Sequence, residues 1–114
     1  MYQIKYADIQ AESPVSAKER EREILQRSID LLERGRAEGV RSIAMIEAVH
    51  FTSRVWTAFL EDLARDDNQL PKEARASLIS IGIWVLKELD AVRDGSTDNF
   101  ADLIEISQII RDGL

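Results

Sequence analysis

The residues that could support catalysis or metal binding are few in this chain and poorly spaced for either. Its 114 residues include one histidine, His50, and no cysteine. A serine or cysteine nucleophile needs a base within reach, and a zinc site usually needs several His or Cys ligands. The sequence also contains no glycine-rich phosphate loop and no calcium-loop spacing. We therefore expect a protein that is not an enzyme and that binds no metal, nucleotide or other cofactor.

One motif resembles a metal site but is incomplete. Glu47 and His50 match the Glu-x-x-His pattern of di-iron helical bundles, and both side chains would project near one helix face. A di-iron centre needs two such pairs and two further carboxylates, so only a symmetric dimer could assemble one from this chain. The simpler interpretation is a partly packed or exposed histidine without a metal.

The aromatic residues are more informative than the titratable ones. Trp56 and Phe59 lie in one apolar segment and Trp84 in the next. Both indoles could belong to the core, since tryptophan is mostly buried, or at least one could line a groove for a helical peptide. Trp84 is the better groove candidate because on a helical wheel it stands apart from the face that contains Gly82 and Leu89.

The segment that contains Trp84 is too apolar for a one-faced surface helix. From Ser77 to Leu89, apolar residues cover about three quarters of the helix circumference. We expect this helix to be wrapped by other helices, by a second chain or by a client peptide. Gly82 lies inside it, where glycine costs about 1 kcal/mol relative to alanine, and either a close helix approach or room for a partner would explain its presence.

The elements that must position these residues are helical. Tyr2, Ile4 and Tyr6 alternate with polar residues, which predicts a short extended arm that lies on the helical body, docks on a partner or stays loose. No other strand signal occurs, so we predict an all-α, single-domain bundle of about four helices over residues 1–114. The predicted helices run from Ser16 to Gly35 or Gly39, from Ser42 to Arg65, from Pro71 to Arg93 and from Asn99 to Arg111.

Composition and charge narrow the range of partners. The net charge is −6, with nine basic and nine acidic residues in positions 1–54 but six and twelve in positions 55–114. The acidic half would repel nucleic acid, and the basic residues of the other half alternate with glutamates as on a solvated helix face. We expect no direct DNA contact, and we disfavour direct RNA contact. With no signal peptide, no run of the ~18 apolar residues that a membrane span needs and no cysteine, we expect a cytoplasmic protein without membrane insertion.

Several blocks of the sequence resemble the FlaF family of alphaproteobacterial flagellar biosynthesis regulators. The resemblance is nearly end to end, although Ser107 stands where relatives have asparagine. It rests on the arm with Tyr2 and Tyr6-Ala7, on Trp56-Thr57 with Leu60, Asp62 and Leu63, on Leu70-Pro71 leading into Ala76–Val85, on Asp98-Asn99-Phe100, on Leu103–Ile106 and on Ile110–Leu114.

The resemblance implies a small cytoplasmic non-enzyme that promotes flagellin synthesis and flagellum assembly. Members of this family are described as binding flagellin, in the manner of a secretion chaperone, and as acting opposite FlbT, which restrains translation of flagellin mRNA. A helical terminal segment of flagellin is the expected ligand, because an apolar helical groove suits it. Direct contact with FlbT stays open.

Two alternatives to flagellin binding stay open from the sequence. One is a post-transcriptional regulator that contacts flagellin mRNA directly, and the other is a purely structural helical homodimer. For the flagellin-binding hypothesis the candidate contact residues are the aromatic residues and the apolar residues beside them. They are Tyr2, Tyr6, Trp56, Phe59, Ile83, Trp84, Phe100, Ile106 and Ile109.

Overall fold

A computed structural model describes residues 14–39 and 41–113, with side chains described from Ala17 onward. It contains helices α2 (Pro14–Glu38), α3 (Ile43–Leu63), α4 (Lys72–Asp94) and α5 (Phe100–Gly113). No strand occurs among the described residues. The prediction of an all-α protein with four helices is therefore confirmed. The predicted arm with Tyr2 and Tyr6 lies outside the described residues.

The helix ends follow local signals close to the predicted positions. Ser42 caps α3: its hydroxyl accepts the Met45 N–H at 3.0 Å and donates to the Gly39 carbonyl at 2.7 Å. Pro71 directly precedes α4, where its missing N–H leaves no helical hydrogen bond unmade. At the other end of α4, Gly95 adopts φ +79°, a left-handed conformation that ends the helix.

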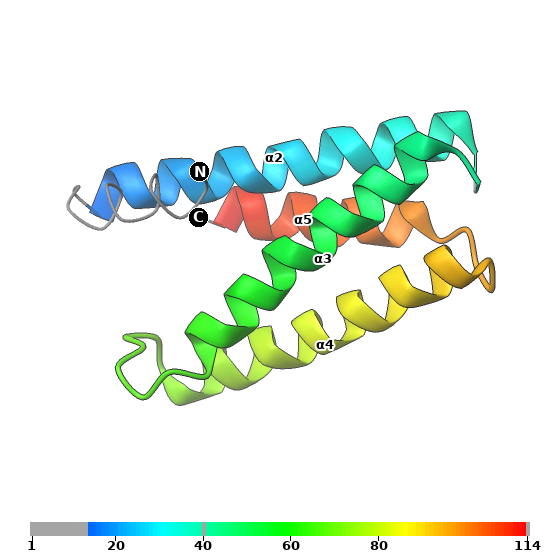
Figure 1. Ribbon diagram of the computed structural model, residues 1–114. Coiled ribbons are helices and arrows are strands. Elements are labelled where there is room, and N and C mark those ends of the chain that lie inside the picture. The colour runs from blue at the N-terminus through cyan, green and yellow to red at the C-terminus, as the bar shows by residue number, and fades with distance from the viewer. Residues whose placement is uncertain (1–13, 40, 114) are drawn as a thin grey trace.

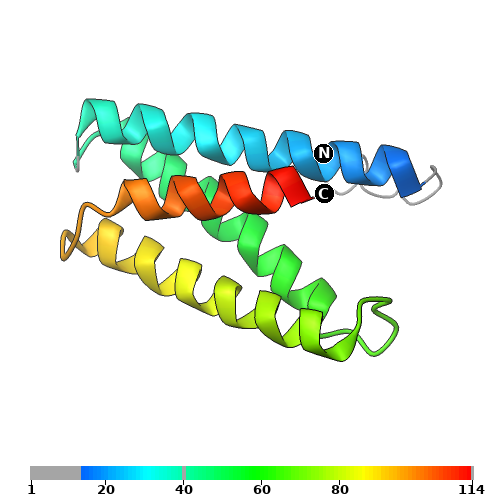
Figure 2. The ribbon, with the colours of Figure 1, turned by 180° about the vertical axis from the view of Figure 1, so that it is seen from behind.

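The four helices do not form a parallel-sided bundle. α2 and α5 lie side by side, α3 crosses them, and α4 packs on α3 (Figure 1). α4 and α5 meet at the turn over residues 95–99 and make little other contact. Seen from behind, α4 diverges from α5 toward its own N-terminus (Figure 2). The molecule is therefore open at the end that contains the α3–α4 loop.

The core is built around α3, which packs on both α2 and α4. Burying these side chains supplies the main driving force for folding, because the hydrophobic effect scales with the apolar area removed from water. The largest buried cluster takes residues from all four helices: Ile29, Leu32, Met45, Ala48, Val49, Trp56, Val85, Leu89, Val92, Phe100, Leu103 and Ile104.

Polar side chains also enter this core. Ser107 is 1% exposed, and its hydroxyl donates to the Leu103 carbonyl at 2.8 Å. The Ser28 and Thr52 hydroxyls and the indole N–H of Trp56 are buried and have no hydrogen-bond partner among the described residues. Buried polar groups of this kind destabilise a fold, since each loses its bond to water without a replacement.

The close approach of α3 and α4 explains the glycine in the middle of α4. A Cβ atom at Gly82 would lie 2.7 Å from Leu60 Cδ2 and 2.9 Å from Leu60 Cγ, which is closer than real contacts allow. The interpretation that a close helix approach requires this glycine is confirmed. The same helix is not enclosed on all sides, however, because Ile83 and Trp84 remain 46% and 38% exposed.

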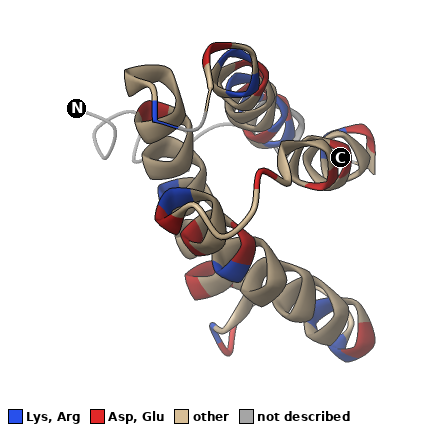
Figure 3. Ribbon diagram, turned by 90° about the vertical axis from the view of Figure 1, so that its right-hand side faces the viewer, with Lys and Arg blue, Asp and Glu red and all other residues tan. Residues whose placement is uncertain are grey.

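Charges are spread over the outer surface of the helices. Both acidic and basic residues occur along the described helices, separated by uncharged stretches (Figure 3). No helix within residues 14–39 and 41–113 combines the length and apolar character that would let it cross a membrane.

Candidate partner-binding pocket

The open end of the molecule contains a pocket of about 550 Å³. All four helices and the α3–α4 loop contribute to it, so residues far apart in the sequence meet here. Its lining consists of Lys18, Glu21, Trp56, Phe59, Asp62, Leu63, Arg65, Asp67, Asn68, Gln69, Leu70, Leu78 and Ile110.

The floor of the pocket is apolar. Trp56 is 1% exposed and packs edge to face on Phe59, with ring centroids 5.6 Å apart and an interplanar angle of 83°. Leu78 of α4 and Ile110 of α5 also line the pocket, and both are only half-buried. A partner that covered them would remove further apolar area from water.

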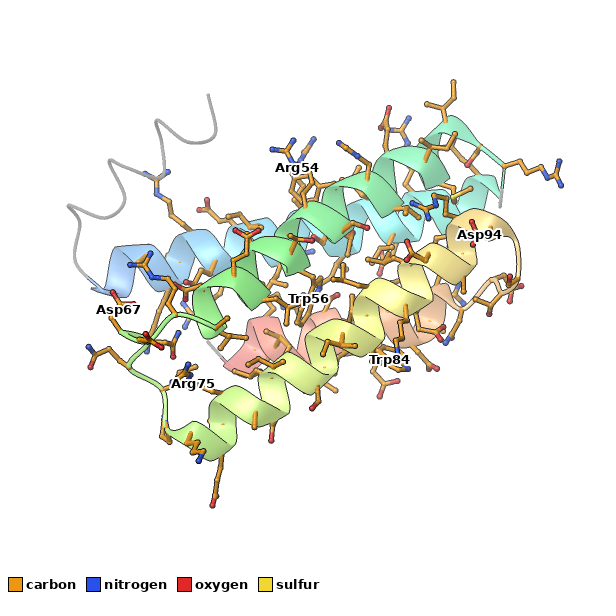
Figure 4. The ribbon with its side chains drawn as sticks, turned by 60° about the horizontal axis from the view of Figure 1, so that its bottom comes forward. Arg54, Trp56, Asp67, Arg75, Trp84 and Asp94 are labelled. Atoms are coloured by element: carbon orange, nitrogen blue, oxygen red, sulfur yellow. The ribbon has the colours of Figure 1, made fainter. Side chains whose placement is uncertain are left out.

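The α3–α4 loop forms a fixed wall of the pocket. The Arg75 guanidinium donates to the Leu63 carbonyl at 2.9 and 3.1 Å and to the Arg65 carbonyl at 3.1 Å. It thereby caps the Leu63 carbonyl at the end of α3, and it shares the Arg65 carbonyl with the Asn68 N–H. The Asn68 side chain donates to the Asp62 carbonyl at 3.2 Å. Figure 4 shows Arg75 reaching from α4 toward this loop.

The rim of the pocket carries an acidic pair. Burial raises the pKa of the Glu21 carboxyl, the negative charge of Asp62 raises it further, and Lys18 partly opposes both effects. Arg65 bonds Asp67 at 3.0 Å, and this bond holds the pKa of Asp67 below its usual value. Arg65 is thus engaged by Asp67, and the paired carboxylates of Glu21 and Asp62 favour the approach of a cation.

An apolar strip, the seam, begins one helical turn from the pocket lining on α4 and α5, since Ile81 follows Leu78 and Ile106 precedes Ile110. The Asn99 side-chain amide donates to the Glu88 carboxylate at 3.2 Å and to the Asp102 carboxylate at 3.0 Å, which places both carboxylates where the two helices meet. Trp84 lies one turn before Glu88 and shares its helix face. Ile106 lies one turn after Asp102 and likewise shares its face.

Four residues make up this seam: Ile81, Trp84, Ile106 and Ile109. Ile81 and Ile106 pack against the core and are partly buried. Trp84 and Ile109 stand at the edges and are 38% and 56% exposed. Large apolar side chains held half in water are typical of surfaces that bind a partner.

The structure distributes the predicted contact residues among different environments. Trp56 and Phe59 line the pocket, and Trp84, Ile106 and Ile109 belong to the seam. Ile83 is exposed but lies about 100° around α4 from Trp84. Phe100 is 2% exposed, so it supports the core and presents no surface in this conformation. Tyr2 and Tyr6 lie outside the described residues.

Sequence reasoning missed part of the pocket. Leu63, Leu78 and Ile110 have the spacing of core residues. This spacing does not distinguish a residue that lines the pocket from a residue that is buried in the core. Asp62 reads as a solvated helix-end residue, yet it faces Glu21 from another helix. The long polar loop over residues 64–71 is the one sequence signal that marks the site, since such loops often surround binding surfaces.

The Glu47 and His50 pair lies elsewhere, on the exposed side of α3. Within the part of the chain that the structure describes, no three His, Asp or Glu side chains are grouped so that they could hold a metal ion.

Comparison with known proteins identifies the family of this chain. No curated protein and no solved structure matches the chain. The family model described as flagellar protein FlaF matches residues 2–114, nearly the whole chain. The chain therefore belongs to the FlaF family of flagellar proteins.

Proposed function

We propose that this protein binds flagellin subunits in the cytoplasm, without enzymatic activity, and that it acts as a secretion chaperone and regulator. In this proposal it promotes flagellin synthesis and flagellum assembly, and it works opposite FlbT. Membership of a flagellar protein family supports the flagellar setting. The choice of a protein ligand rests on the character of the pocket and the seam.

The single observation that carries the proposal is an apolar pocket with the half-exposed seam beginning one helical turn from its lining. A helical terminal segment of flagellin has the shape to lie along α4 and α5, with apolar side chains against Trp84 and Ile109 and one side chain entering the pocket over Phe59. Helix-in-groove binding takes most of its free energy from a few buried apolar anchors. Trp84 is suited to be such an anchor because its indole offers a large apolar area.

A bound flagellin helix would be unavailable for polymerisation. The complex would therefore keep the subunit in a form ready for export. The concentration of the complex would report how much flagellin is free. A direct contact with FlbT would couple that signal to translation of flagellin mRNA.

The proposal is tested by substituting the residues at the two edges of the seam, Trp84 and Ile109. Trp84→Ala and Ile109→Ala should each weaken binding of purified flagellin in isothermal titration calorimetry, the Trp84 change by about 2 kcal/mol, or roughly thirtyfold in Kd. Ile43→Ala is the matched control: Ile43 is 75% exposed at the distant start of α3, and its removal should leave Kd unchanged.

Three results would count against the proposal. Equal affinity in all three variants would place flagellin elsewhere on the molecule. Binding of flagellin mRNA in preference to flagellin would support the direct RNA alternative. A stable homodimer that does not bind flagellin would support the purely structural role.

A further inference from the structure

The charged residues of the pocket indicate which kind of side chain enters it. Five charged residues line the pocket: Lys18, Glu21, Asp62, Arg65 and Asp67. Arg65 and Asp67 neutralise each other through their ion pair at 3.0 Å. Lys18 offsets one of the two remaining carboxylates, so the lining carries an excess of one negative charge.

The carboxylates of Glu21 and Asp62 are available to a ligand. Within the described part of the chain, no salt bridge joins either of them to a basic side chain. Asp62 accepts a long hydrogen bond of 3.4 Å from the Asn68 amide. Burial and the charge of Asp62 raise the pKa of Glu21 in spite of the opposing effect of Lys18. A further cation at this place would therefore stabilise both carboxylates in their charged form.

The apolar lining restricts the ligand further. Phe59 and Leu78 are half-buried and line the same pocket as the two carboxylates. A purely apolar side chain would cover the carboxylates without pairing them, which is unfavourable. Lysine and arginine instead combine a long aliphatic stem, which packs on apolar surface, with a cationic head that reaches a charge at its edge. A pocket of about 550 Å³ has room for one such side chain.

We propose that the pocket binds one lysine or arginine side chain of the client helix, with its stem on Phe59 and Leu78 and its cationic head at Glu21 and Asp62. This inference rests on the proposed function, because the flagellin helix supplies the side chain. The apolar seam fits many amphipathic helices, whereas the pocket requires a cation at a fixed place beside the seam. The pocket therefore selects the client and sets the register in which its helix lies.

The test is a pair of neutral, nearly isosteric substitutions in the full chain. Glu21→Gln with Asp62→Asn should weaken binding of purified flagellin about tenfold in isothermal titration calorimetry and make the affinity less sensitive to salt. The control chain carries Glu19→Gln with Glu61→Gln. Both of these residues are exposed, neighbour the tested residues in sequence and lie outside the pocket lining, and the net charge changes equally. The control should bind flagellin like the wild type.

Loss of the fold would not explain the expected result. Glu21→Gln with Asp62→Asn removes the repulsion between two carboxylates, so its midpoint of thermal unfolding should equal or exceed that of the wild type. Circular dichroism measures this midpoint.

Substitutions in flagellin identify the bound side chain. Each lysine and arginine of the helical terminal segments is replaced singly by glutamine. One replacement should weaken binding to the wild-type chain about tenfold and have little further effect on binding to the chain with Glu21→Gln and Asp62→Asn, because both changes remove the same contact.

The outcomes separate this inference from the proposed function. Flagellin that binds the wild type and the Glu21→Gln, Asp62→Asn chain equally well would overturn the inference alone. The same holds if no basic residue of the terminal segments affects binding to the wild type. Flagellin that does not bind the wild type would overturn the proposed function and this inference with it.

Discussion

Trp56 and Trp84 differ in burial because of where their helices place them. Trp56 lies on α3, the helix that packs on both α2 and α4, and its indole is enclosed in the core. Trp84 lies on the side of α4 that leads to the junction with α5, where little contact covers it. Figure 4 shows Trp56 in the space that the helices enclose and Trp84 at the outer side of α4. The same residue type thus stabilises the fold in one case and is available to a partner in the other.

This difference predicts unequal effects on stability. Trp56→Ala should lower the free energy of unfolding by about 3–5 kcal/mol, because it removes a fully buried side chain and leaves a cavity. Trp84→Ala should lower it by about 1 kcal/mol or less, since the indole already lies partly in water. Urea denaturation followed by circular dichroism measures both values. A large loss of stability in Trp84→Ala would mean that this indole belongs to the core and would remove the basis of the binding test.

Among the elements, the packing of α3 on α4 decides the shape of the pocket. Gly82 lets Leu60 approach the backbone of α4, and this contact fixes how closely the two helices lie. Arg75 then ties the first turn of α4 to the end of α3 through two backbone carbonyls. With α4 held to α3 in this way, its N-terminal half is directed away from α5 (Figure 2).

The Gly82 contact predicts a coupled pair of substitutions. Gly82→Val should lower the free energy of unfolding by about 1–3 kcal/mol, because the added atoms overlap Leu60. In a chain that already carries Leu60→Ala, the same Gly82→Val change should lower the free energy of unfolding much less, because the Leu60 side chain no longer occupies the space beside Gly82. Thermal unfolding of the four chains of this double-mutant cycle gives the coupling.

The control for this cycle is Gly113→Ala, because a Cβ atom at Gly113 meets nothing within 4 Å. That change should leave stability nearly unchanged. Additive effects of the Gly82 and Leu60 changes would show that the two helices do not depend on this contact.

At the scale of the whole molecule, the charge distribution leads us to expect a protein partner rather than a nucleic acid. The net charge is −6, and both acidic and basic residues occur along the described helices (Figure 3). Nucleic-acid binding needs cations that face phosphates without nearby anions to compete for them. The pocket and seam instead offer apolar area with an acidic edge, which suits a helix that has apolar and basic residues.

This charge distribution predicts a weak salt dependence of client binding. The affinity for flagellin should change by less than about tenfold between 50 and 200 mM salt, since apolar contacts supply most of the binding free energy. A protein with several phosphate contacts would lose about 10³-fold or more over the same range. Titration calorimetry at the two salt concentrations makes the comparison. A loss of affinity of about 10³-fold or more would favour a nucleic-acid partner over a flagellin helix.

The sequence by itself determined the elements of this protein. Apolar residues at a spacing of three and four predict each helix, and Ser42, Pro71 and Gly95 mark helix ends through local capping and backbone conformation. These signals are local, so they can be read without knowing the fold. The sequence blocks around Trp56, Trp84 and Phe100 also pointed to the family that the whole-chain match shows.

Only the tertiary structure decided which apolar residues form the core and which line the pocket. Leu78 and Val85 are two turns apart on the same face of α4, yet Val85 is fully buried and Leu78 lines the pocket. Likewise, the charge of Asp62 raises the pKa of Glu21 only because the fold brings residues of α2 and α3 to the same pocket. The physical reason is that periodicity fixes the direction of a side chain around its helix, whereas the angle between helices fixes how much space lies in front of it.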